Sequence, residues 1–121
     1  MSIRILAVDD SRTIRDLLAH ALLGAGYEVT LAEDGADALD RLSEAAPDAI
    51  ISDINMPRLD GFGLIQAVRQ IDRYRATPIL VLTTESAPEL KARARAAGAT
   101  GWIVKPFAPE KLVQALQMIT G

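Results

Sequence analysis

The stretch that decides the fold is IRILAVDDS, residues 3–11. After Arg4 it runs through four aliphatic residues, without the polar alternation of a strand that has one exposed face. Such a run predicts a strand that is buried on both faces, as in a parallel sheet covered by helices. Two carboxylates follow the run, and Ser11 after them is a favoured residue for capping a helix. The stretch therefore predicts a buried strand, an acidic turn and a helix in direct succession.

The same succession of strand and helix occurs five times along the chain. We expect strands at residues 3–8, 27–32, 49–52, 78–82 and 102–104. We expect helices from the Ser11 cap to about Gly24, over residues 35–45, after Gly61, from a Ser86 cap and Pro88 to about Gly98, and over residues 109–119. Right-handed crossovers between such strands give an α/β fold, a doubly wound five-stranded parallel sheet with five helices. No Gly/Ser-rich or Pro-rich linker interrupts the pattern, which predicts one domain over residues 1–121.

Composition excludes several classes of function. A length of 121 residues suits one domain, so we expect no output domain beside it. Thirteen Lys and Arg against sixteen Asp and Glu give a formal net charge of −3, so we expect no nucleic-acid partner. The chain has no cysteine for disulfides, thiolate metal sites or thiol catalysis, and its N-terminus lacks the pattern of a signal peptide. No apolar run approaches the length of a membrane span. We expect a cytoplasmic protein without membrane insertion.

Three carboxylates are expected at one edge of the sheet. Asp9 and Asp10 follow the first strand and Asp53 follows the third, and ligands bind outside the carboxyl ends of parallel strands where the winding reverses. Clustered carboxylates repel one another, and Mg²⁺ prefers oxygen ligands of this kind. Alone, the Asp9-Asp10 pair would suit an acidic helix entry equally well, and Asp53 alone would suit a loop. Together, the three favour a metal site.

Two further polar residues follow strands and should reach the same edge. Lys105 offers a cationic group for a phosphoryl oxygen, and Thr83 offers a hydroxyl donor. Taken alone, the lysine suits a solvated charge and the threonine a turn. The Lys105-Pro106 sequence also invites a cis peptide bond.

Four motifs together resemble the response-regulator receiver family, and within it the single-domain, CheY-like chemotaxis group. The motifs are Val8-Asp9-Asp10-Ser11, Asp53-Ile54-Asn55-Met56-Pro57 with Gly61, Thr83-Thr84, and Lys105-Pro106-Phe107. They appear in the family's order and span nearly the whole chain. The resemblance implies a flavodoxin-like sheet with strand order 2-1-3-4-5.

The resemblance also implies a magnesium-dependent phosphorylation site. Asp53 would be the phosphoacceptor. Asp10 and Asp53 would ligate Mg²⁺ with the backbone carbonyl of Asn55, and Asp9 would act partly through water. Lys105 and Thr83 would contact the phosphoryl group.

Signal lifetime and output follow from the same resemblance. Asn55 and Glu85 stand at positions that tune dephosphorylation, and this polar pair predicts a short-lived signal. Trp102 stands where receivers usually carry a switching tyrosine. The surface that binds partners would include Lys91, Arg95, Trp102 and Lys111.

The implied donor is a CheA-like histidine kinase, the implied target is the flagellar motor switch, and the implied state is a monomer. The chain would catalyse only its own phosphorylation and dephosphorylation. A phosphorelay shuttle or a phosphate sink without motor binding stays open as an alternative. An FMN-binding flavodoxin is disfavoured because Asp9-Asp10 would repel the phosphate, and a haloacid-dehalogenase-type phosphatase is disfavoured because its Asp-x-Asp motif is missing. We interpret His20 as a helix-surface residue.

Overall fold

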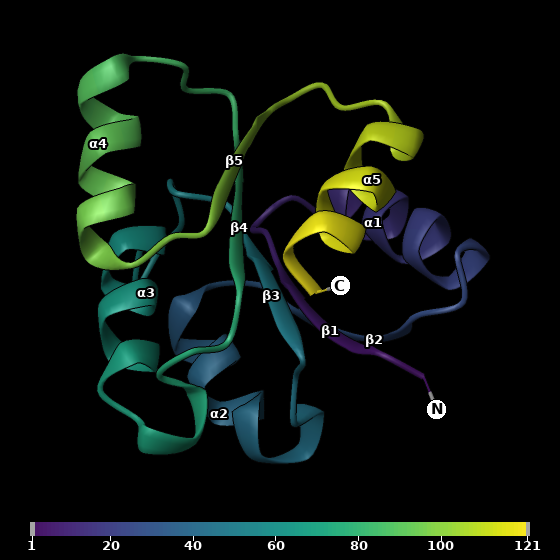
Figure 1. Cartoon of the computed structure of the whole chain (residues 1–121), viewed down its shortest axis with the longest axis horizontal. Coiled ribbons are helices and arrows are strands. Elements are labelled where there is room, and N and C mark those ends of the chain that lie inside the picture. The colour runs from purple at the N-terminus through teal and green to yellow at the C-terminus, as the bar shows by residue number, and fades with distance from the viewer. Residues whose placement is uncertain (1, 121) are drawn as a thin grey trace.

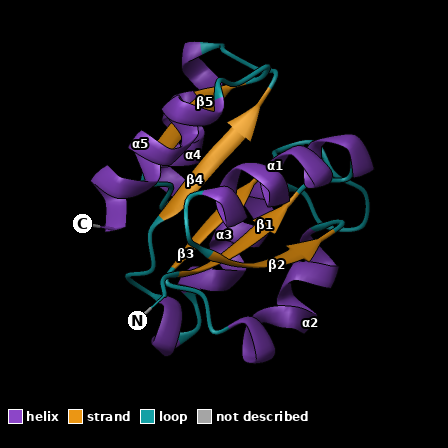
Figure 2. Cartoon of the chain, turned by 90° about the vertical axis from the view of Figure 1, so that its right-hand side faces the viewer, coloured by secondary structure: helices purple, strands orange, loops and turns teal. Residues whose placement is uncertain are grey.

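The computed structural model describes residues 2–120. Strand β1 (Arg4–Val8) lies inside a parallel sheet of five strands. The sheet has the order β2-β1-β3-β4-β5, which confirms the expected winding. The other strands are β2 (Glu28–Ala32), β3 (Ala49–Ser52), β4 (Ile79–Thr83) and β5 (Gly101–Val104). All four neighbouring pairs are parallel, and Leu6 of β1 lies between Thr30 and Ile50. Figure 2 shows the strand arrows pointing the same way.

Within residues 2–120, five α-helices cover the two faces of the sheet (Figure 1). They are α1 (Arg12–Gly24), α2 (Gly35–Ala45), α3 (Gly61–Arg69), α4 (Pro88–Ala97) and α5 (Pro109–Thr120). Helices α1 and α5 lie on one face, and α2, α3 and α4 lie on the other. Alternate residues of β1 therefore enter different cores, because successive side chains of a strand point to opposite faces. Leu6 and Val8 belong to the core between the sheet and helices α2, α3 and α4. Ile5 and Ala7 belong to the core between the sheet and helices α1 and α5.

Both faces of the inner strands are buried, as the unbroken aliphatic runs predicted. All residues of β3 and β4 are buried, including the polar Ser52 and Thr83. The Ser11 hydroxyl accepts a hydrogen bond from the Ile14 amide, so the predicted cap of α1 is confirmed. None of the helices within residues 2–120 is both long and apolar enough to cross a membrane.

One predicted helix start was wrong. Ser86 does not cap α4; the N-cap is Ala87, which makes no side-chain capping bond. The Ala87 carbonyl accepts the amides of Leu90 and Lys91, and Pro88 in the first turn has no N–H to satisfy. The predicted bounds of all five strands agree with the observed bounds to within one residue. Strand β4 extends to Thr83, which pairs with Val104. A short 3-10 helix, η1 (Asp72–Tyr74), had no prediction.

Candidate functional site

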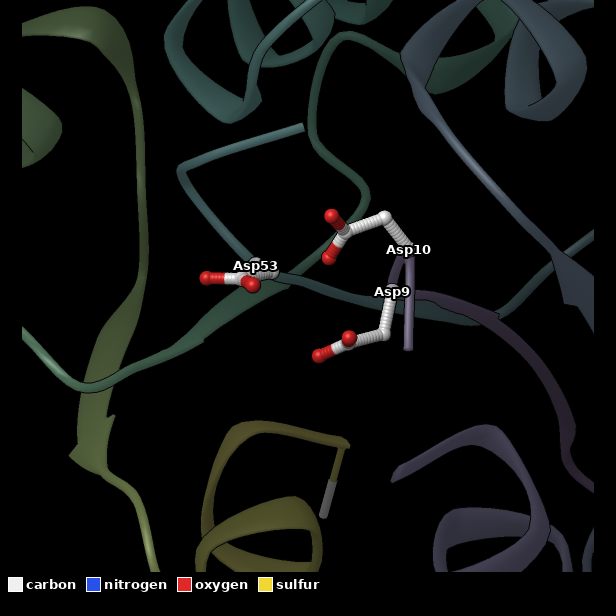
Figure 3. Close-up of side chains that lie close together, drawn as sticks. All are labelled: Asp9, Asp10 and Asp53. Carbon is white, nitrogen blue, oxygen red and sulfur yellow. The ribbon is translucent and has the colours of Figure 1, made fainter. Parts of the chain in front are cut away.

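Three aspartates meet at the carboxyl edge of the sheet. Asp9 and Asp10 directly follow β1, and Asp53 directly follows β3, the neighbouring strand. One carboxylate oxygen from each residue lies within 4.8 Å of the other two. Figure 3 shows the three side chains lying close together, with those of Asp9 and Asp10 extending toward Asp53. The sequence prediction that these residues come together is therefore confirmed.

Backbone hydrogen bonds between the strand ends fix the two inner aspartates. The Asp9 amide donates to Ala32 O at 3.1 Å, and the Asp53 amide donates to Val8 O at 3.0 Å. The carboxylates are held as well, because Asp9 Oδ1 accepts from the Ser11 amide at 2.9 Å and Asp53 Oδ1 accepts from the Ile54 amide at 2.7 Å. Asp9 and Asp53 are buried, and Asp10 is exposed. The site therefore has a buried, hydrogen-bonded floor and one side, at Asp10, that opens to solvent.

Lys105 joins two of the three carboxylates. Its Nζ lies 2.8 Å from Asp9 Oδ2 and 3.1 Å from Asp53 Oδ2, and its side chain is only 10% exposed. The Lys105 amide donates to Thr83 O at 2.7 Å, which ties the lysine to the end of β4. The Lys105-Pro106 bond is cis. The lysine therefore belongs to the cluster and is not a solvated surface charge.

The cluster contains more acidic groups than basic groups. Burial raises the pKa of Asp9, although hydrogen bonds from Lys105 and Ser11 work in the opposite direction. Burial also works to lower the pKa of Lys105, but its hydrogen bonds to Asp9 and Asp53 raise the pKa overall. One ammonium faces three carboxylates. With all groups ionised, two negative charges remain, so the site favours a cation with oxygen ligands.

Thr83 and Trp102 are linked through one residue of the loop after β4. The buried Thr83 hydroxyl accepts from the Glu85 amide at 3.3 Å, and the Trp102 indole N–H donates to Glu85 O at 3.1 Å. Trp102 is half-buried and contacts the core on the α2–α4 side. The Trp102 ring therefore has a backbone hydrogen-bond acceptor in the loop after β4.

The other predicted residues lie around this centre. Asn55 is exposed on the loop after β3. Lys91 and Arg95 line one shallow cavity with Trp102, whereas Lys111 lies exposed on α5 and is not part of that lining. His20 is exposed on α1, as interpreted from the sequence.

Sequence reasoning missed two arginines beside the site. Arg15 donates from Nη1 to Asp9 O at 2.8 Å, and Arg58 forms an ion pair with Asp34, 24 residues away along the chain. The position of Arg58 directly after Met56-Pro57 marked it as a loop residue, but no local pattern identified its partner.

Comparison with known families decides the identity. The family model for the response regulator receiver domain matches residues 5–117. The chain belongs to the response regulator receiver domain family. This receiver domain thus comes from a family of two-component response regulators, which take phosphate from histidine kinases.

Solved structures agree with this assignment. The receiver domain is 51% identical to the chemotaxis protein CheY4 of Vibrio cholerae, covering 98% of this chain and 99% of that one with a TM-score of 0.95. It is 30% identical to the receiver domain of the sensor histidine kinase PA1611 from Pseudomonas aeruginosa, covering 100% and 99% of the chains with a TM-score of 0.91. That protein holds a magnesium ion in its active-site cleft. The flavodoxin-like, CheY-like fold predicted from the motifs is therefore confirmed.

Curated relatives include longer proteins. The response regulator MprA of Mycobacterium tuberculosis strain H37Rv is 42% identical over 123 residues, which cover 98% of this chain and 51% of that protein. The receiver domain thus spans about half the length of the curated relatives it matches.

Proposed function

We propose that this receiver domain is a magnesium-dependent switch that is phosphorylated on Asp53. The contact of Lys105 Nζ with both Asp53 and Asp9 carries the proposal. It places a cation against the oxygen that would bond to phosphorus, within a group of three carboxylates. Carboxylate and carbonyl oxygens suit Mg²⁺, and Asp9, Asp10, Asp53 and the Asn55 carbonyl would hold the ion. When bound, the ion would offset negative charge on the phosphoryl oxygens.

Phosphoryl transfer from a kinase histidine would proceed through groups of this chain. A carboxylate oxygen of Asp53 bonds to phosphorus while the bond from the imidazole nitrogen to phosphorus breaks, and the nitrogen keeps the electron pair. Lys105 donates to a phosphoryl oxygen, a preorganised contact in a partly buried site. The Thr83 hydroxyl accepts from Glu85, and a hydroxyl that accepts one hydrogen bond can donate another to the phosphoryl group.

Dephosphorylation would take place at the same centre. Water attacks the phosphorus, inorganic phosphate leaves, and the Asp53 carboxylate is restored. Asn55 is exposed and Glu85 half-exposed, so both are accessible to act on that water. We propose that this polar pair keeps the signal short-lived, and that the chain catalyses no reaction other than its own phosphorylation cycle.

The output surface would include Trp102 with Lys91 and Arg95, and Lys111 on α5. Phosphorylation that draws Thr83 toward the phosphoryl group would disturb its bond to Glu85, the residue that Trp102 also contacts. We propose a CheA-like kinase as donor and the flagellar motor switch as target. The likeness to the chemotaxis protein CheY4 supports both.

We also propose that the receiver domain acts alone, as a cytoplasmic monomer without nucleic-acid or membrane-inserted partners. The longer MprA relatives make the intact mass of the native protein the test of this point. A phosphorelay shuttle or a phosphate sink would use the same site. A pull-down with motor-switch protein separates these roles from motor control, because the motor-switch protein should retain only a motor regulator in a phosphorylation-dependent way.

The first experiment follows Trp102 fluorescence during titration with acetyl phosphate, with Mg²⁺ or with EDTA, on the wild type and on Asp53→Ala. We expect a reversible, magnesium-dependent change that the variant lacks. Intact mass spectrometry reports the phosphoryl group directly. Absence of a phosphorylated species in the wild type, with donor and Mg²⁺ present, would overturn the proposed function.

A further inference from the structure

The loop between β3 and α3, residues 53–60, carries the Asn55 carbonyl but forms neither helix nor strand. Two backbone hydrogen bonds help to close it: the Leu59 amide donates to Pro57 O at 2.7 Å, and the Gly61 amide donates to Ile54 O at 2.8 Å. Both bonds lie within the connection from β3 to α3, the second of them joining Ile54 to the first residue of α3. At its start the loop is held by the bond from the Asp53 amide to Val8 O and by the buried Ile54, so the place of the Asn55 carbonyl also depends on how residues 56–60 are attached to the rest of the fold.

An ion pair supplies such an attachment. Arg58 donates from Nε to Asp34 Oδ2 at 2.7 Å and from Nη2 to Asp34 Oδ1 at 2.9 Å. A two-point contact of this kind fixes the guanidinium in orientation as well as in distance. The Asp34 side chain is 4% exposed and that of Arg58 is 56% exposed. Asp34 is therefore the buried partner of the ion pair, and Arg58 is the exposed one.

Asp34 is itself bound to the scaffold. It lies two residues beyond the end of β2 and caps α2, accepting from the Asp37 amide at 2.8 Å. A second tie runs beside it, from the Gly35 amide to Leu59 O at 3.0 Å. A Cβ on Gly35 would lie only 2.4 Å from that oxygen, so the loop rests directly on the first turn of α2.

The backbone of Arg58 points to the same role. Its φ of 67° lies in the left-handed region, which residues other than glycine seldom adopt. A glycine would fit this backbone more easily but would lose the bond to Asp34. The left-handed backbone of Arg58 and its ion pair with Asp34 thus occur together. Arg58→Gly would suit this backbone but remove the ion pair, so it is an informative substitution.

We propose that Arg58 is a positioning residue of the metal site, which by binding Asp34 holds the loop so that the Asn55 carbonyl is placed to accept Mg²⁺. The inference rests on the proposed function, because that proposal assigns the carbonyl to the metal. Residues that orient metal ligands typically change affinity by about 10- to 100-fold. Arg58 acts through three residues of backbone, so we expect an effect near the lower end, about tenfold.

The test measures the dissociation constant of Mg²⁺ by isothermal titration calorimetry on the full chain. Arg58→Ala and Arg58→Gly should each weaken binding about tenfold, and Arg58→Lys should restore part of the loss. Arg41→Ala is the matched control, because it removes a similarly exposed arginine that pairs with Asp37 and Glu44 on α2. It should leave the constant unchanged.

A kinetic measurement separates positioning from general loss of structure. At saturating Mg²⁺ and acetyl phosphate, the Arg58 variants should phosphorylate at the wild-type rate, with only the Mg²⁺ concentration for half-maximal rate shifted. Mg²⁺ constants within about twofold of wild type for both Arg58→Ala and Arg58→Gly, or an equal loss in Arg41→Ala, would overturn the inference. If the wild type itself binds no Mg²⁺, the proposed function fails as well, so the two failures are distinguishable.

Discussion

At the scale of single residues, we infer two opposing effects of Lys105 on the proposed site. Its ammonium lies within 3.1 Å of both Asp9 and Asp53, where it compensates their charge before any phosphate arrives. The same positive charge opposes the entry of a divalent cation, because like charges repel more strongly in a poorly solvated site. Once a phosphoryl group is present, the lysine can donate to its oxygens. We therefore expect this one side chain to weaken metal binding and to favour phosphoryl transfer.

Lys105→Met should separate these two effects. We expect Mg²⁺ to bind more tightly, because a cation leaves the site. Phosphorylation by acetyl phosphate should become at least about 100-fold slower, because a preorganised donor to the transferring group is lost. Calorimetry and intact mass spectrometry over time measure the two quantities. Arg41→Met, which removes a cation from α2, is the control, and an unchanged phosphorylation rate in Lys105→Met would contradict the role given to the lysine.

At the scale of elements, the connection from β3 to α3 is crowded around Asp53. A Cβ on Gly61 would lie 2.3 Å from Asp53 O and 2.8 Å from Ile54 Cα, and both obstacles are backbone atoms. Asp60 caps α3 by accepting from the Gly63 amide at 2.8 Å, so the helix begins at a fixed point. The start of α3 therefore presses against the backbone of Asp53, and glycine at position 61 is required by this close approach.

Gly61→Ala should lower the free energy of unfolding by about 1–3 kcal/mol, as expected for overpacking. It should also slow phosphorylation, because the backbone that must move belongs to Asp53. Gly24→Ala is the matched control, since a Cβ there meets nothing within 4 Å and alanine favours the helix. Urea unfolding gives both energies. Equal stability of Gly61→Ala and wild type would show that the loop yields at little cost.

At the scale of the whole molecule, acid stability reflects carboxylates with shifts of opposite sign. The Arg58 guanidinium lowers the pKa of Asp34, so this group stabilises the fold above its unfolded pKa of about 3.9. Burial raises the pKa of Asp9, so its contribution is present at low pH and is lost as pH rises through the folded value. The metal-free protein therefore gains stability near neutral pH from Asp34 and loses some through Asp9.

Asp34→Asn should be less stable than wild type near neutral pH in EDTA. The difference should shrink as pH falls from about 4 through the lowered pKa of Asp34, because the wild-type carboxylate is then protonated as well. Urea unfolding over a series of pH values measures the difference. Asp40→Asn, on an exposed position of α2, is the control and should follow the wild-type profile. A constant difference across the acid range would contradict the ion pair's part in acid stability.

Much of the architecture could be predicted from the sequence because it depends on local signals. Aliphatic runs marked the buried strands, and β3 (Ala49–Ser52) and α2 (Gly35–Ala45) were predicted with the bounds that the structure shows. Asp9, Asp10 and Asp53 could be brought together because the carboxyl ends of parallel strands share one edge. Lys105 was expected there for the same reason.

Contacts between distant segments were decided only by the tertiary structure. The bond from Arg58 to Asp34 spans 24 residues, and that from Trp102 to Glu85 spans 17. The identity of each partner depends on where two loops lie after the helices have docked on the sheet, and no periodic pattern records this. The structure also decided the start of α4, where Ala87 and not the expected Ser86 is the N-cap. Sequence determined the strands and the residues at their ends, because periodicity and winding are local rules; packing decided which side chains those residues touch.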